Sequence, residues 1–335
     1  MFFFRLHFIY TPLLLVIVFG VTVLVTMPPN NIRIEAGPKG GFFDSTAHYL
    51  KEELGRVGVE AEVVNVDDTT NIVKRLNAGD KDAADLGFVA QELNPQDCQH
   101  VTSLGAVMIE PLFIFARADS DIREITDMKG KRLAIGPEAS GTRRLAEEIV
   151  TLFGITEENS KFVPRHATDD EKLIVQGDVD AAFFLLPPET ELVQRLGKNP
   201  RLHVINLEHA KAVSKMYPYL QEVLIPKGGF SVTDNLPESE ITAVALPVTI
   251  VAKEGFTDSL AALIALILKE RFESPTLVTE ANTLPSHLYQ ELAINPHASK
   301  LHKNDLPYFL QFASPTLAVT LWTSAWTRAF LCWRC

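Results

Sequence analysis

The chain has 335 residues and 47% hydrophobic content, which is enough for two lobes of ordinary size, each with a core. Its formal net charge is −11, and no run of Lys or Arg interrupts the acidic average. Because phosphate binding needs a basic surface, we expect no nucleic-acid partner. The three cysteines, Cys98, Cys332 and Cys335, cannot form a disulfide framework.

The N-terminal segment is apolar enough to cross a membrane. Phe8 to Met27 carries no charge over 20 residues, and Arg5 before it favours an N-terminus inside the cell. A cleavable signal peptide is the competing interpretation, but it normally has a shorter apolar region and a small-x-small cleavage site. Here the segment ends in VTMPPNN. We therefore predict a membrane anchor over residues 1–28, in the cytoplasmic (inner) membrane, with the main body in the periplasm or another extracytoplasmic space.

A second apolar stretch lies near the C-terminus. Leu306 to Thr327 carries no charge, and arginines follow it. Two interpretations stay open for residues 301–335. They form either a second membrane span, with both basic ends inside, or an apolar tail that lies on a surface.

Between these ends, one pattern of strands and helices occurs twice. The first copy has strands over 32–36, 61–66 and 86–89, a glycine loop over 37–41, and helices after the loop and over 69–77. The second copy has strands over 132–135 and near 162–163, a loop over 136–141, and helices after the loop and over 170–175. The two copies match most closely at Gly79-Asp80-Lys81-Asp82-Ala83-Ala84 and Gly177-Asp178-Val179-Asp180-Ala181-Ala182, which both lead into apolar strands.

The repeat predicts an α/β protein of two lobes, each with a mainly parallel sheet flanked by helices. Apolar strands at Pro111–Ala118 and Ala243–Ala252 would connect the lobes as a two-stranded hinge. The helix over 257–272 would complete the first lobe. We therefore assign residues 29–116 and 243–300 to lobe 1 and residues 117–242 to lobe 2. In such sheets ligands bind at the carboxyl ends of the strands, so both glycine loops should face one cleft.

The second glycine loop has the chemistry of an anion site. The N-terminus of a helix offers free N–H groups and the positive end of the helix dipole. Ser140, Gly141 and Thr142 add two hydroxyls and a glycine that lets a ligand approach the backbone. The alternative is that Ser140 or Thr142 only caps its own helix.

Two pairs of phenylalanines follow the repeated motifs. Phe42 and Phe43 come directly after the first glycine loop and would give apolar walls to a cleft or pack the start of the helix. Phe183 and Phe184 lie in the strand after the second Gly-Asp motif. Because side chains alternate along a strand, one of them should face the core and the other the cleft.

No sequence motif of catalysis is present. The chain contains no His-x-x-x-His, Gly-x-Ser-x-Gly or phosphate-binding Walker loop. The nine histidines are scattered, and Asp67-Asp68 and Asp169-Asp170 precede helices, where capping explains them. We expect a binding protein that is not an enzyme and that has no metal and no cofactor.

In their order, these motifs resemble those of a known family. The relevant segments are Gly37–Phe43 (GPKGGFF), Ala84–Val89 (ADLGFV), Lys129–Thr142, Gly177–Phe184 and Tyr217-Pro218. The chain resembles the TAXI-type (NMT1-like) solute receptors of tripartite ATP-independent periplasmic (TRAP) transporters, which have the two-lobed type II periplasmic binding protein fold. The resemblance spans about residues 31–300. It implies a receptor that closes two lobes on a small organic anion, an amino acid or another carboxylate, and presents it to TRAP permease subunits.

The resemblance also implies roles for individual residues. Ser140, Gly141 and Thr142 would hold the ligand carboxylate, and Gly41, Phe42 and Phe43 would form the opposing wall, with Phe184 added from the second repeat. The family's glutamine after the Ala-Asp strand aligns with Ala90, and Gln91 stands one place later. A membrane-anchored ligand sensor or interaction module without a role in transport is the alternative function, and a permease gene beside this one would favour transport.

Overall fold

The computed structural model describes residues 31–303, except 80–82, 139, 164–166 and 289–290, together with the isolated positions 14, 17, 20 and 21. The predicted membrane anchor (apart from those four positions) and the predicted C-terminal apolar stretch lie outside the described residues. In the described part of the chain, no helix combines the length and the apolar character that crossing a membrane requires.

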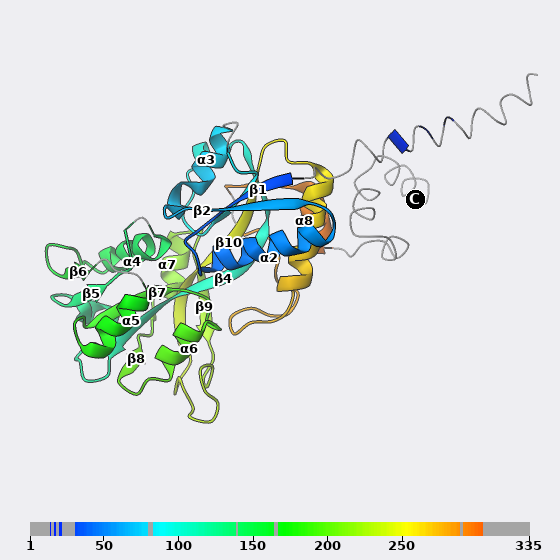
Figure 1. Cartoon of the computed structure of the whole chain (residues 1–335). Coiled ribbons are helices and arrows are strands. Elements are labelled where there is room, and N and C mark those ends of the chain that lie inside the picture. Colours follow the sequence, from blue (N-terminus) through cyan, green and yellow to red (C-terminus); the bar gives the residue numbers. More distant parts are fainter. Residues whose placement is uncertain are drawn as a thin grey trace, which may run out of the picture.

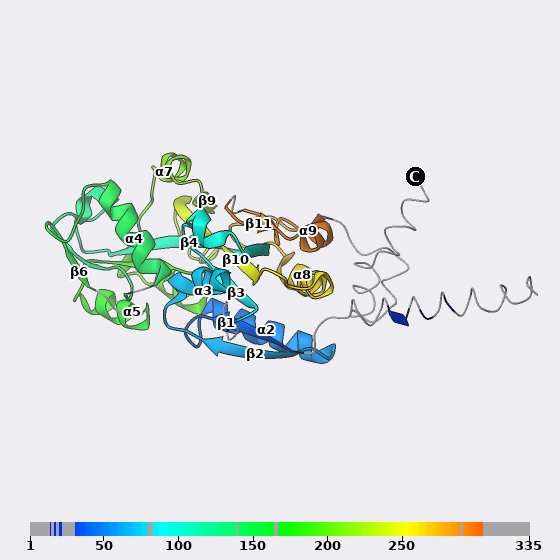
Figure 2. The same ribbon diagram turned by 90° about the horizontal axis from the view of Figure 1, so that it is seen from above.

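The described chain forms two α/β halves joined by two long strands (Figures 1 and 2). The strands of the first half are β1 (Asn31–Ala36), β2 (Glu60–Asn65), β3 (Leu86–Val89) and the short β11 (Ala293–Ile294). Its helices are α2 (Phe42–Arg56), α3 (Ile72–Ala78), α8 (Asp258–Phe272) and α9 (Pro296–Lys303), with the short 3-10 turns η1 (Thr69–Asn71) and η2 (Pro95–Cys98).

The second half contains the other short elements. Its strands are β5 (Arg132–Ala134), β6 (Lys161–Val163), β7 (Ala181–Leu185), β8 (Leu202–Val204) and β9 (Gln221–Ile225). Its helices are α4 (Gly141–Leu152), α5 (Ala167–Gln176), α6 (Glu191–Gly197) and α7 (Ala210–Met216), with the 3-10 turn η3 (Ile125–Met128). The connecting strands are β4 (Val101–Arg117) and β10 (Ile241–Lys253).

The strands follow the order β2-β1-β3-β10-β4-β7-β5-β6. The three outer strands of each half are parallel, as predicted. The connecting strands run antiparallel to their neighbours, β10 beside β3 and β4 beside β7. The α/β class is therefore confirmed. The sheet is mixed rather than mainly parallel, because β4 and β10 pass from one half to the other and pair antiparallel with β7 and β3.

The predicted repeat is present in three dimensions. The unit β1-α2-β2-α3-β3 recurs as β5-α4-β6-α5-β7, and the parallel pairings are the same in both copies. Gly79 and Gly177 both end a helix with a positive φ, of 66° and 85°. The aspartates that match, however, are Asp85 and Asp180, because each directly precedes a strand and accepts from the backbone N–H of an arginine in the neighbouring strand.

The connection between the halves is a continuous strand pair. β4 and β10 pair antiparallel from Val101 opposite Lys253 to Pro111 opposite Ala245. Each strand then continues into the second half, β4 beside β7 and β10 beside β9. Pro111 and Pro247 lie where the strands leave the first half, and each lacks the N–H that a ladder bond needs. The predicted segments 111–118 and 243–252 are thus parts of longer strands.

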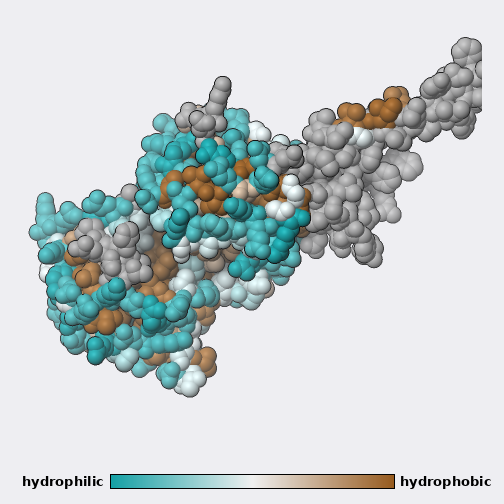
Figure 3. Space-filling model, viewed as in Figure 1, coloured by the Kyte–Doolittle hydropathy of each residue, from teal (hydrophilic) through white to brown (hydrophobic). Residues whose placement is uncertain are grey.

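The cores follow the sheet across the molecule. One buried cluster lies within the first half and includes most of α8, which is apolar on all sides. Another cluster extends from α3 across the connecting strands to α4 and β7. Figure 3 shows a mainly hydrophilic surface over both halves, with hydrophobic residues gathered over β1 and β2 and near the junction.

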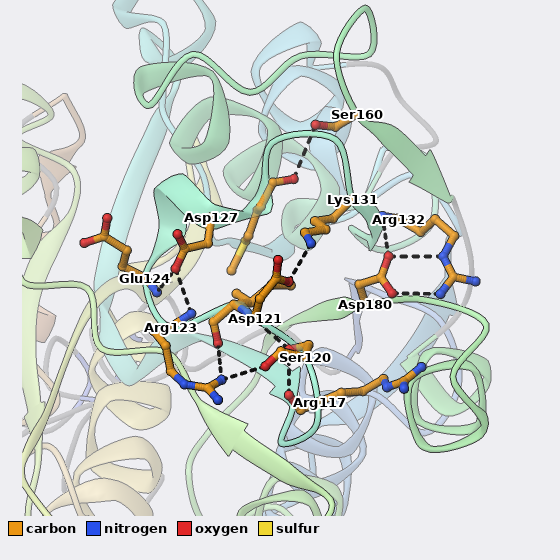
Figure 4. Close-up of polar contacts among 12 residues, drawn as sticks. Arg117, Ser120, Asp121, Arg123, Glu124, Asp127, Lys131, Arg132, Ser160 and Asp180 are labelled. Atoms are coloured by element: carbon orange, nitrogen blue, oxygen red, sulfur yellow. Dashed lines mark hydrogen bonds and ion pairs between the residues drawn. The ribbon is translucent and has the colours of Figure 1, made fainter.

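A paired arginine and aspartate fix the start of two parallel strands in the second half. Asp180 accepts from the Arg132 backbone N–H at 2.9 Å, from Nε at 3.1 Å and from Nη2 at 2.7 Å (Figure 4). The hydrogen bonds from the Arg132 side chain lower the pKa of Asp180 below its ordinary value of 3.8. The carboxylate therefore stabilises the fold above that pH and loses this contribution as the pH falls through its lowered pKa.

We predict that Asp180→Ala lowers the free energy of unfolding by about 1–3 kcal/mol near pH 7, because the Arg132 backbone and guanidinium lose a charged acceptor. The loss should shrink below about pH 4. Urea titrations at several pH values measure both effects. Asp119→Ala is the matched control, since Asp119 pairs with Arg117 but its side chain is 71% exposed. Equal effects of the two substitutions would contradict the prediction.

Candidate functional site

Both glycine loops line one cavity between the two halves of the protein. The cavity has a volume of about 210 Å³. Drug-sized sites measure roughly 300–1,000 Å³, so this space fits a small molecule. It lies where the strands β1, β3 and β7 end and the helices α2 and α4 begin. Its lining residues are Gly37, Pro38, Gly41, Phe42, Phe43, Thr69, Ala90, Gln91, Glu110, Gly141, Thr142, Leu185 and Leu186.

The first loop is held by an aspartate that points back from α2. The helix begins at Phe42 after the N-cap Gly41, so Asp44 lies in its first turn and is not its cap. The Asp44 carboxylate accepts from the Gly40 N–H at 2.8 Å and from Asn65 Nδ2 at 2.6 Å. Asn65 Nδ2 also donates to the Gly37 carbonyl at 2.8 Å. The bond from Gly40, followed by that from Asn65, lowers the pKa of Asp44, so the loop is fixed by an ionised group.

In the second loop, Ser140 caps its own helix. Its hydroxyl donates to the Pro137 carbonyl at 2.7 Å and accepts from the Arg143 N–H at 3.2 Å. The first helical bond after it runs from the Arg144 N–H to the Ser140 carbonyl. The N–H groups of Gly141 and Thr142 have no acceptor among the residues that the structure describes. The capping alternative therefore describes the Ser140 side chain, and the backbone after it stays available.

Gly141 lies close to the backbone of the first half. A Cβ added to it would lie 3.3 Å from the Ala90 carbonyl oxygen of the first half and 3.7 Å from Leu185 Cδ2. Its φ is not in the left-handed region, so a side chain would meet this steric contact but no backbone strain. Glycine at this position allows the turn to face the other half directly.

The structure brings six of the eight predicted site residues to the cavity, namely Gly41, Phe42, Phe43, Gln91, Gly141 and Thr142. Ser140 is not among the lining residues, because its hydroxyl is used in the cap. Phe184 is 1% exposed and packs edge-on against Phe115, with ring centroids 5.9 Å apart. Phe183 is equally buried on the other face of β7, so Leu185 and Leu186 line the cavity in place of the phenylalanines.

The aromatic pair has both of the roles that the sequence allowed. The Phe43 ring stacks on Phe88 of β3 at 5.0 Å, and the Phe42 ring lies 6.1 Å from Phe272 of α8. Both also line the cavity. Gln91 is positioned by a 2.7 Å bond from its Nε2 to the Thr70 carbonyl.

Glu110 is the lining residue that sequence reasoning missed most clearly. It lies on β4 opposite Leu246 and is only 5% exposed. A signal was present, because it is the single acidic residue in the apolar run VTSLGAVMIEPLFIFAR. Burial raises the pKa of Glu110 from 4.5 to about 8. Near pH 7 the Glu110 carboxyl therefore carries its proton.

Two larger hollows are open to the surface at the other end of the strands. One, of about 440 Å³, lies at the start of β7 and β8 and includes Arg117 and Arg201. The other, of about 530 Å³, lies at the start of β1, β2 and β3 and includes Arg33 and Lys253. Neither is lined by a glycine loop, so we take the smaller cavity as the candidate site. Within the described ranges, no group of three His, Cys, Asp or Glu residues is placed to hold a metal.

We predict that the unfolding free energy of the wild-type chain without added ligand falls relative to that of Glu110→Gln as the pH rises from about 5 to about 9. The unfolded chain loses the Glu110 proton near pH 4.5, whereas the folded chain keeps it until about pH 8. The stabilisation by the protonated form is therefore complete below the unfolded pKa and is lost through the folded pKa. The relative change should be on the order of 4 kcal/mol.

Urea titrations at about pH 5, 7 and 9 measure this difference. Glu92→Gln serves as the control, because its side chain is 54% exposed beside Arg144. Curves for wild type and Glu110→Gln that stay parallel over the whole pH range would show that Glu110 is not a desolvated acid.

Comparisons with known proteins give the following matches. The sequence profile of the NMT1-like family matches residues 61–309. The periplasmic aliphatic sulphonate binding protein SsuA from Escherichia coli aligns at a TM-score of 0.44 and 15% identity over 72% of each chain. Holo ArgBP from T. maritima aligns at a TM-score of 0.43 and 18% identity, over 73% of this chain and 92% of that one. XAC2383 from Xanthomonas citri, bound to ATP, aligns at a TM-score of 0.47 and 11% identity, over 75% of this chain and 91% of that one.

Proposed function

The chain belongs to the NMT1-like family, and from that premise we propose that it is an extracytoplasmic solute-binding protein that captures a small organic anion between its two halves. The observation that carries the proposal is the cavity that both glycine loops line. A ligand in this cavity contacts residues of the first half, such as Gly41, and of the second half, such as Gly141. It therefore stabilises the arrangement in which the two halves are close.

The polar groups offered to an anion are backbone N–H groups. The helices α2 and α4 both begin at the cavity. The N–H groups of Phe42 and Phe43 in α2, and of Gly141 and Thr142 in α4, have no acceptor in the described part of the chain. Each helix N-terminus also carries about half a positive charge from the helix dipole. A carboxylate satisfies these donors without a cationic side chain.

The connecting strands provide the means of closure. β4 and β10 are the two long strands that the halves share, and Pro111 and Pro247 each remove a ladder donor where the strands cross. A small rotation at these positions moves α4 relative to α2. Gly141 faces Ala90 across the junction, so the contact between the halves closes over the ligand.

The finer assignment is a TAXI-type receptor that presents its ligand to TRAP permease subunits. The apolar segment Phe8–Met27 would anchor the chain in the cytoplasmic membrane and keep the body beside such a permease. The support for this assignment is the order of the glycine-loop, Ala-Asp and Ser-Gly-Thr motifs in the sequence. Co-purification of the full chain with the permease subunits encoded beside it tests the partner directly.

We predict that a screen of organic acids and amino acids against the full chain in detergent identifies a ligand that raises the thermal midpoint. A ligand at 100 times its Kd stabilises the folded state by roughly 2.7 kcal/mol, which corresponds to a rise on the order of 5 °C. Gly141→Val should abolish the rise, because the added Cβ meets the Ala90 carbonyl oxygen at 3.3 Å and covers the donors of α4.

Gly55→Val is the matched control, since a Cβ there has no neighbour within 4 Å. The control should keep the full rise, and both variants should unfold at nearly the wild-type midpoint when no ligand is present. A rise that persists in Gly141→Val would place the ligand outside this cavity and end the proposal.

A further inference from the structure

The cavity contains an acid and no base. Of the described residues that line it, Glu110 is the only ionisable one, and the remainder are glycines, apolar residues, two threonines and Gln91. The charged residues Glu92, Arg144 and Glu148 line a separate small hollow beside Gly141. A site meant only for anions would be expected to hold no carboxyl group, because an ionised carboxylate repels a bound anion.

Glu110 also has no partner in the protein. Two other acids are at least nine-tenths buried in the described chain, and both are paired. Glu35 is 6% exposed and pairs with Arg75, and Asp44 is 9% exposed and accepts from Gly40 and Asn65. The Glu110 carboxyl, at 5% exposure, makes no hydrogen bond or ion pair with any described residue. A buried carboxyl without a protein partner destabilises the fold, so its position at the cavity indicates that the ligand supplies the partner.

We propose that Glu110 binds a positively charged nitrogen of the ligand while the N-termini of α2 and α4 bind its carboxylate. This inference rests on the proposed function and narrows its ligand class. The preferred ligand is an organic acid that also carries an ammonium or guanidinium group, such as an amino acid, rather than a dicarboxylate or a simple fatty acid. Such a ligand brings one charge for each end of the cavity and leaves no net charge buried.

The groups that would bind the two charges of the ligand belong to different elements of the fold. The carboxylate donors belong to the first turns of two helices, one from each half. Glu110 belongs to the strand β4 that both halves share, between Ile109 and Pro111. The acid is therefore held by a central strand, whereas the donors move with the halves. A ligand with both groups contacts all three parts, so its nitrogen helps to select the closed arrangement.

Binding should release a proton near neutral pH. Without ligand the Glu110 carboxyl is protonated there because burial raises its pKa to about 8. An ammonium beside it favours the ionised form. No other ionisable side chain of the described residues lines the cavity, so the proton comes from Glu110. Calorimetric titrations in buffers of different ionisation enthalpy count the protons released.

The test uses matched pairs of probes that differ only in the α-ammonium group. The pairs are L-glutamate and glutarate, and L-leucine and 4-methylpentanoate. Each is titrated calorimetrically at pH 7 into the full wild-type chain and into Glu110→Gln. Glu92→Gln is the control, a cleft carboxylate that does not line the cavity.

For at least one pair we expect the wild type to bind the amino acid and release about one proton. Glu110→Gln should bind it at least about 30-fold more weakly, because a buried charge pair is lost, and should release no proton. The deaminated acid should bind the variant no more weakly than the wild type. Glu92→Gln should behave as wild type throughout.

Three results would overturn the inference. First, the deaminated acids could bind the wild type as tightly as the amino acids do, and their affinity could fall as the pH rises. This would mean that protonated Glu110 donates a hydrogen bond to an anionic ligand. Glu110→Gln could keep full affinity for the amino acid. In both cases loss of binding in Gly141→Val would leave the proposed function standing. If no probe bound the wild type, the inference and the proposed function would fail together for these ligand classes.

Discussion

The pairing of β4 with β10 is the constraint on which the rest of the structure depends. These strands are hydrogen-bonded from Val101 to Pro111, and each then continues into the other half. Each half completes its sheet with a strand that the other half also uses. The relative position of the two glycine loops is therefore set by the register of this one pair. Glu110, opposite Leu246 in that register, is placed between the loops for the same reason.

The chemistry of the cavity follows from this placement. The strands β1 and β5, which α2 and α4 follow, run in opposite directions in the two halves. Both helices therefore begin at the cavity between the halves, and two helix N-termini converge there without any basic side chain. The connecting strand adds the one acid. Backbone donors at fixed positions and a single buried carboxyl give the cavity an internal polarity, which favours a ligand that is itself polar from end to end. The apolar walls of Phe42, Phe43 and Leu185 then admit different side chains.

The two copies of the repeated unit show how a sequence match and a structural match can differ. Asp180 follows Gly177 by three residues, whereas Asp85, its structural equivalent, follows Gly79 by six. The similar residues after each glycine suggested a different alignment, in which Asp82 was the equivalent of Asp180. What is shared is the role, since each aspartate accepts from the backbone N–H of an arginine in the neighbouring parallel strand. That role requires a position immediately before a strand and does not fix the distance from the preceding helix.

Sequence alone determined the α/β class, the repeated unit, the two long connections and the two glycine loops, because hydrophobic period, glycine position and helix caps are local properties. It also predicted that both glycine loops face one cleft, since ligands bind at the carboxyl ends of the strands in such sheets. Only the tertiary structure decided that Ser140 is used up as a cap, that Phe184 is enclosed in the core, and that Glu110 lies unpaired in the cavity. These facts depend on which strand lies beside which and in what register, and no local pattern encodes contacts between residues so far apart in the chain.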